Sequence, residues 1–277
     1  MNLVMSPEER QALLEARKTM DYTKTRFDFI NDHYGLRKKN FHLLMGTAGT
    51  GKSTLARSIL FDLAKHHKVF FFSSEETLEQ TKTMYAMRDV DSTILENITF
   101  WHEREAEKES GEKLEEFLRL LELKIMNSGC EVLFFDNLTT SGFYDPRKPD
   151  EQSRIITHLF KILNSCDIAG FFVAHTANGV KDDQQGLIST SDVRGSKQLT
   201  NKAEFVYIYQ RFICSPKGQS TSPVSYGTIR NLKGRGYDVG NIYLLDYDFN
   251  KNEYYGDVKI PNTKFKEIYD ERFKLGK

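Results

Sequence analysis

The feature that most constrains the fold of this chain is a glycine-rich run between an apolar stretch and a helical pattern. The run reads Gly46, Thr47, Ala48, Gly49, Thr50, Gly51, Lys52 and Ser53, with Thr54 next. It matches the spacing G-x-x-x-x-G-K-[ST] at every position. The apolar run 41–46 predicts a strand before it, and 52–65 predicts a helix after it. Glycines let successive backbone N–H groups converge on an anion, and the helix N-terminus adds partial positive charge. The sequence therefore predicts a phosphate-binding loop over residues 46–54.

The last two positions of this motif carry specific chemistry. In a loop of this kind the amine of Lys52 reaches the β- and γ-phosphates of a nucleoside triphosphate, and the hydroxyl of Ser53 ligates Mg²⁺. The expected ligands are therefore ATP and Mg²⁺. A chance glycine-rich turn is the alternative, but it does not explain why a strand and a helix flank the run.

Short apolar runs alternate with amphipathic stretches through the first two thirds of the chain, which is typical of a parallel sheet flanked by helices. The predicted strands are 41–46, 68–73, 98–102, 131–136 and 169–174. After residue 203 three strand-like runs follow one another without helices, at 204–209, 226–232 and 241–247. The predicted fold class is α/β, with a mostly parallel central sheet flanked by helices and antiparallel strands added at the C-terminal end.

Three segments are expected. Residues 1–34 form an N-terminal helix and linker segment, in which a capping box of Ser6 and Glu9 predicts a helix over 6–20. Residues 35–260 form the main domain, and 261–277 form a C-terminal helical tail. The helix over 6–20 is too short to be stable alone, so we expect it to pack on its own body or on a neighbouring subunit.

Composition narrows the class of protein. Lys plus Arg and Asp plus Glu number 39 each, so the formal net charge is zero, which argues against an all-over basic coat but leaves room for a local basic channel. No apolar run approaches the roughly 20 residues that span a bilayer. The N-terminus lacks a secretory pattern, and three scattered cysteines indicate reduced thiols. We expect no membrane contact and a cytoplasmic location, in bacteria or a phage-infected host.

Polar residues follow three of the predicted strands. Asp136 ends the run 131–135, at the sheet edge where a carboxylate organises a metal through water; the plainer alternative is an Asp that starts a turn. Glu75 and Glu76 follow 68–73 and either activate water or stabilise the dipole of a following helix. His175 either senses a γ-phosphate or is a buried, hydrogen-bonded structural histidine.

Taken in order, these motifs resemble the RecA-fold ATPase domain of DnaB-type ring helicases, especially phage primase-helicases and the mitochondrial Twinkle helicase. The resemblance covers roughly residues 35–260. Besides the phosphate loop, the motifs are GLRKK (35–39), SSEET (73–77), FDN (135–137), DE (150–151), VAH (173–175), SDVRGS (191–196) and LKGR (232–235). The resemblance implies a RecA-like P-loop NTPase fold and ATP hydrolysis in a homo-oligomer, expected to be a hexameric ring.

The resemblance also implies a role for each matching residue. Glu75 becomes the catalytic base, Asp136 the Mg²⁺ organiser and His175 the phosphate sensor. Lys233 and Arg235 become groups that reach the γ-phosphate bound to the adjacent subunit, although the residues alone favour a solvated strand end. Such a shared site requires head-to-tail contacts between subunits.

The segment 177–203 corresponds to the family's central DNA-binding loop. Lys181, Arg194 and Lys197 supply positive charge for the phosphates of single-stranded DNA. Asp182 and Asp183 lie in the same loop, which holds no aromatic residue for base stacking. The loop 139–150 carries Phe143, Tyr144, Arg147 and Lys148 and either supplements DNA binding or is an ordinary surface turn.

The predicted function is an ATP-driven, ring-forming DNA translocase or helicase. The principal alternative is a RecA-like ATPase that remodels or regulates a protein or DNA complex without unwinding. A filament-forming recombinase shares the same core. A small-molecule kinase is disfavoured because the sequence shows no acceptor pocket.

Overall fold

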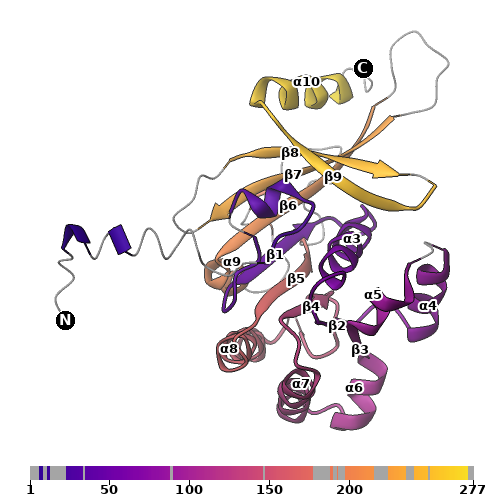
Figure 1. Ribbon diagram of the computed structural model, residues 1–277, viewed down its shortest axis with the longest axis vertical. Helices are drawn as coiled ribbons and strands as arrows, with labels where there is room; N and C mark the ends of the chain where they lie inside the picture. The colour runs from indigo at the N-terminus through magenta and orange to yellow at the C-terminus, as the bar shows by residue number, and fades with distance from the viewer. Residues whose placement is uncertain are drawn as a thin grey trace.

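The computed structural model describes residues 6–8, 11–12, 23–33, 35–87, 90–145, 147–176, 188–189, 192, 197–214, 224–234, 240–248 and 250–273. In these parts of the chain nine strands form one sheet, in the order β3-β2-β4-β5-β1-β6-β7-β8-β9 (Figure 1). The strands are β1 (Phe41–Gly46), β2 (Val69–Ser73), β3 (Ile98–His102), β4 (Val132–Asp136), β5 (Ala169–His175), β6 (Phe205–Cys214), β7 (Val224–Gly234), β8 (Ile242–Asp248) and β9 (Glu253–Ile260).

The sheet has a parallel half and an antiparallel half. Strands β1 to β6 pair in parallel where they meet, and β6 to β9 run antiparallel as a meander. Every residue of β1, β2 and β4 is buried, because helices cover both faces of the parallel half. This burial explains why these strands are continuous apolar runs rather than alternating patterns.

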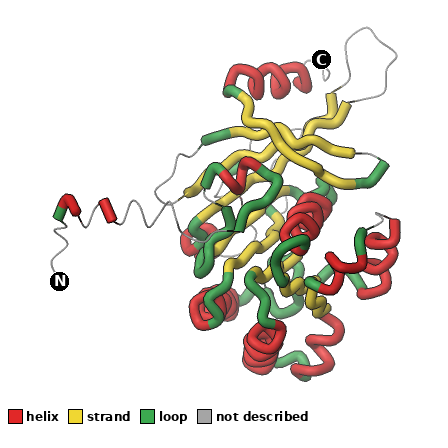
Figure 2. Tube along the Cα trace, in the orientation of Figure 1, coloured by secondary structure: helices red, strands yellow, loops and turns green. Residues whose placement is uncertain are grey.

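Helices lie on both sides of the sheet, as Figures 1 and 2 show. Those whose side chains join the core on one face are α6 (Glu103–Ser110), α7 (Leu114–Ser128), α8 (Pro149–Ser165) and α9 (Gln198–Lys202). The other face is covered by α2 (Asp28–Asn31) and α3 (Lys52–Ala64), with α5 (Ser92–Glu96) at its margin. The remaining helices are α4 (Leu78–Met87) and α10 (Asn262–Phe273).

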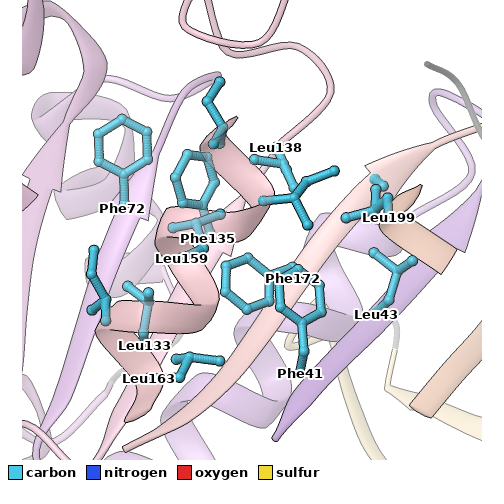
Figure 3. Close-up of a cluster of buried hydrophobic side chains, with 14 of the residues drawn as sticks. Phe41, Leu43, Phe72, Leu133, Phe135, Leu138, Leu159, Leu163, Phe172 and Leu199 are labelled. Atoms are coloured by element: carbon cyan, nitrogen blue, oxygen red, sulfur yellow. The ribbon is translucent and has the colours of Figure 1, made fainter. Parts of the chain in front are cut away.

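Alternate residues of each central strand enter the two cores. In β1, Phe41 and Leu43 face the α6–α9 side, whereas Leu44 faces the α2–α3 side. On the first side the rings of Phe41 and Phe172 stack with their centroids 3.8 Å apart, and Leu159 of α8 lies in the same cluster (Figure 3). These apolar layers fix the sheet between its helices and so fix the strand ends that carry the site.

The predicted fold class is confirmed, with a mostly parallel sheet and C-terminal antiparallel strands. Strand β9 was not predicted; it is an edge strand, and its residues Tyr255 and Val258 are about half exposed. The strand predicted over 226–232 starts two residues too late, since β7 begins at Val224. Most of the helix predicted over 6–20 lies outside the described residues. None of the described helices combines the length and apolar composition that crossing a bilayer requires.

Residues 23–33, assigned from the sequence to a linker segment, pack against the C-terminal hairpin. Phe27, Phe29 and Ile30 are fully buried. The carboxylate of Asp257 on β9 accepts hydrogen bonds from the backbone N–H of Asp28 at 2.6 Å and of Phe29 at 2.9 Å. Residues 23–33 therefore share a core with the sheet, and the division at residues 34 and 260 stays a prediction.

The Asp257 contact gives a test of this packing. Burial raises the pKa of Asp257 to about 7, so at pH 8 the carboxylate is ionised and accepts both bonds. Asp257→Ala leaves two backbone donors without their partner, and we expect the free energy of unfolding at pH 8 to fall by about 1–3 kcal/mol. Asp257→Asn keeps one oxygen as an acceptor, so its free energy of unfolding should fall by less. Chemical denaturation measures both.

The matched control is Glu267→Ala, which removes an exposed carboxylate paired with Lys264. This surface change should stay within about 0.5 kcal/mol of the wild type. If Asp257→Ala is as stable as Glu267→Ala, the hairpin does not hold residues 23–33 in place.

Candidate functional site

The glycine-rich run forms a loop between β1 and α3, as predicted. Gly46 ends β1 and Lys52 begins α3. Gly51 caps the helix with φ of 108°, a conformation that favours glycine. A Cβ at Gly46 would lie 2.5 Å from the backbone carbonyl oxygen of Tyr209, so only glycine fits there. The backbone of the loop is thus shaped by its glycines at both ends.

Two tyrosines from the antiparallel half hold this loop. The hydroxyl of Tyr209 on β6 donates to the carbonyl of Thr50 at 2.9 Å. The hydroxyl of Tyr254 on β9 lies 2.7 Å from that of Tyr209 and donates to it, because the proton of Tyr209 is already used. No motif marks these tyrosines in the sequence, and only the strand pattern around 204–209 places one of them near the site.

Lys52 is positioned for an anion inside the loop. Lys52 is the first residue of α3 and is 3% exposed. Its Nζ donates a hydrogen bond to the carbonyl of Thr47 at 2.5 Å. A buried ammonium directed back along a loop of backbone N–H groups fits a polyphosphate. These residues therefore fit the nucleotide predicted from the sequence.

Ser53 and Asp136 lie together beside the loop. The Ser53 hydroxyl donates to Oδ1 of Asp136 at 3.2 Å. Asp136 ends β4 and is 5% exposed, and burial raises its pKa to about 6, although the Arg57 guanidinium opposes the shift. A desolvated carboxylate next to a hydroxyl provides oxygen ligands of the kind Mg²⁺ prefers. In the described part of the chain no three His, Cys, Asp or Glu side chains gather as a metal site, so phosphate and water oxygens would complete the coordination.

The two adjacent glutamates after β2 face different partners. Glu75 Oε1 lies 3.1 Å from Nε2 of His175, and this hydrogen bond is the largest cause lowering the pKa of Glu75. Glu76 instead forms an ion pair with Arg57 of α3. The sequence left both glutamates as candidates for water activation. Glu75 thus pairs with His175 and lies close enough to Lys52 for the lysine charge to contribute to the lowered pKa of Glu75, whereas Glu76 pairs with Arg57.

His175 ends β5, next to the phosphate loop. In the β1–β5 register it pairs with Gly46. Its backbone N–H donates to Oγ1 of Thr139 at 2.8 Å, which joins it to the loop that follows Asp136. The structure thus brings Lys52, Ser53, Glu75, Asp136 and His175 to one edge of the sheet.

Of the two basic residues predicted to act across an interface, Lys233 is described and contacts another part of the subunit. Lys233, near the end of β7, donates from Nζ to the carbonyls of Thr200 and Asn201, both at 2.7 Å. These carbonyls belong to α9, so in a single subunit Lys233 ties β7 to that helix. Arg235 lies outside the described residues.

The predicted nucleic-acid residues are only partly described. Lys181 and Arg194 lie outside the described residues, and Lys197 is exposed just before α9. The suggestion that the loop 139–150 offers aromatic rings to DNA is wrong. Phe143 and Tyr144 are 8% and 1% exposed, and Phe143 stacks on Phe117 with centroids 3.9 Å apart, because both rings complete the core over α7.

Comparison with known proteins agrees with this geometry. Residues 23–214 match the family described as "ATPase: KaiC". The fold is similar to that of a KaiC-like protein from the hyperthermophilic archaeon Pyrococcus horikoshii OT3, with a TM-score of 0.58 and 15% identity over 87% of this chain and 99% of that one. No curated protein matches the chain. The RecA-like fold is confirmed, and the resemblance to DnaB-type helicases stays a prediction. The chain belongs to the KaiC family of RecA-like ATPases.

Proposed function

We propose that this chain is an ATP-driven motor that hydrolyses Mg-ATP at the interfaces of a homo-oligomeric, hexameric ring and moves along single-stranded DNA as a translocase or helicase. The observation that carries the proposal is the Glu75 carboxylate, bonded to His175 on the same sheet edge as the phosphate loop. A water-activating carboxylate joined to a polar sensor is the arrangement that an ATP-hydrolysing motor needs.

In this mechanism each side chain has one task. Lys52 and the loop N–H groups bind the phosphates, and Ser53 with Asp136 would hold Mg²⁺, which neutralises charge on the β- and γ-phosphates. Glu75 would take a proton from the attacking water. The water oxygen would bond to the γ-phosphorus while the bond between the γ-phosphorus and the ADP oxygen breaks. His175 contacts Glu75 through Nε2, so a movement of the His175 ring would also move or reorient the Glu75 carboxylate.

The ring part of the proposal rests on the resemblance. Lys233 and Arg235 would stabilise charge on the γ-phosphate bound to the next subunit, as groups supplied across an interface do in related chemistry. Lys233 would exchange its contacts with α9 for that phosphate. Head-to-tail contacts of this type close into a ring or continue as a filament, and we propose the ring.

Single-stranded DNA would pass along the segment 177–203, where Lys181, Arg194 and Lys197 contact its phosphates. A second candidate is an ATPase that remodels or regulates a protein or DNA complex without unwinding. The burial of Phe143 and Tyr144 favours this alternative, because it removes two rings from any base-stacking surface. The zero net charge points the same way.

Replacing the two glutamates separately tests the hydrolytic assignment. Glu75→Gln should bind Mg-ATP with unchanged affinity and lower kcat by about 10²–10⁴-fold, because only proton removal from water is lost. Glu76→Gln is the matched control at the next position and should retain most of the turnover. Steady-state ATPase assays and titration with a non-hydrolysable analogue give the two readouts. If Glu75→Gln turns over normally and Glu76→Gln loses turnover, the catalytic base is Glu76 and not Glu75.

A forked DNA substrate distinguishes the motor from the remodelling ATPase. We expect wild-type protein with ATP to displace the strand, and Lys52→Ala to be inactive because the charge on the phosphates is lost. Single-stranded DNA should stimulate ATPase and be released steeply by salt. Lys197→Ala should weaken DNA binding and reduce the salt slope by about 1, whereas the exposed Lys264→Ala should not. ATPase activity that ignores DNA at low salt would leave the remodelling function.

A further inference from the structure

Two hydrogen-bond donors meet on the same oxygen of Glu75. Nε2 of His175 lies 3.1 Å from Oε1, and Oγ1 of Thr140 donates to it at 3.0 Å. Among the described residues no protein donor bonds the second oxygen, Oε2. The side chain of Glu75 is 37% exposed, so water reaches this side chain. One oxygen is held and the other is available.

The proton of Thr140 is directed to Glu75. Its other nearby acceptors are the carbonyl of Asn137 at 3.4 Å and the hydroxyl oxygen of Ser74 at 3.1 Å, and both are uncharged. The neighbouring hydroxyl of Ser74 has its own acceptor in that carbonyl at 2.8 Å, and it receives the Asn137 N–H at 3.0 Å. A carboxylate is the stronger acceptor, so the Thr140 hydroxyl donates to Oε1.

The backbone on both sides of Thr140 is anchored. Thr139, 3% exposed, donates from Oγ1 to Asn137 Oδ1 at 2.8 Å. On the other side, Oε1 of Glu103 in α6 accepts from the Ser141 hydroxyl at 2.6 Å and from the Gly142 N–H at 2.8 Å. An exposed hydroxyl between two anchored neighbours has a fixed direction, which is what positions a reacting group.

We infer that Thr140 is a positioning residue for ATP hydrolysis: together with His175 it fixes Oε1 of Glu75, so that Oε2 is presented to the attacking water. The inference rests on the proposed role of Glu75 as base. If the hydrogen bond from Thr140 is lost, only the hydrogen bond with His175 holds the carboxylate. The carboxylate can then take more orientations, and fewer of them direct Oε2 at the water. Thr140 itself touches neither water nor nucleotide in this role.

The test compares three side chains at position 140. Thr140→Val keeps the shape and loses the hydroxyl, and we expect kcat to fall about tenfold, because a hydrogen bond to a charged group is lost at the reacting centre. The Kd of a non-hydrolysable ATP analogue should stay within about twofold of that of the wild type. Thr140→Ser restores the donor and should recover most of the rate. Thr93→Val is the matched control, since Thr93 is also an exposed threonine that donates to a carboxylate, that of Asp91 at 2.8 Å.

A double mutant separates positioning from loop damage. In a Glu75→Gln background, where no base remains to be positioned, Thr140→Val should lower the single-turnover rate no further. An equal loss in both backgrounds, or a Thr140→Ser variant as slow as Thr140→Val, would overturn the inference. If Thr140→Val turns over like the wild type and Glu75→Gln is slow, the inference about Thr140 is overturned but the proposed function stands. Wild-type turnover by Glu75→Gln overturns both.

Discussion

The hydrogen-bond register of the parallel strands is the constraint on which the whole site depends. Gly46 pairs with His175, and Ser73 pairs with Asp136. Phe135 pairs with Phe172, so β1 and β5 extend about two residues beyond the ends of β2 and β4. The phosphate loop, the glutamate after β2 and the two strand-end side chains therefore lie along one edge. A slip of one residue in any of these pairs would turn a strand-end side chain to the opposite face, where apolar helices pack.

The sequence predicted the parts of this arrangement that depend on local pattern. The phosphate loop has a fixed spacing, and the buried strands are unbroken apolar runs, so the fold and the placement of Asp136 and His175 at strand ends follow from them. Edge strand β9 was missed because its side chains are only partly buried and its pattern is weak. The rings of Phe143 and Tyr144 were misplaced because nothing local to a loop tells whether another element covers it.

Contacts between distant segments account for the rest. The different partners of the two adjacent glutamates depend on Arg57, 19 positions before Glu76, and on the folding of α3 against β2. The hydroxyl of Thr140 meets Glu75 across 65 positions, and Tyr209 meets Thr50 across 159. Threonine and tyrosine at these places have no spacing rule, so their role is visible only when the chain is folded.

Strand β6 connects two places that a ring would use for different nucleotides. Tyr209 binds the predicted phosphate loop at Thr50, whereas Val206, three residues earlier, pairs with Lys233 of β7. These points are about 10 Å apart along one hydrogen-bonded strand. The register of β6 against β7 shifts between Val206 and Tyr207, so an irregularity in the strand pairing lies between these two points. In the proposed ring, one short strand would therefore join the loop that binds one nucleotide to the lysine that reaches the next.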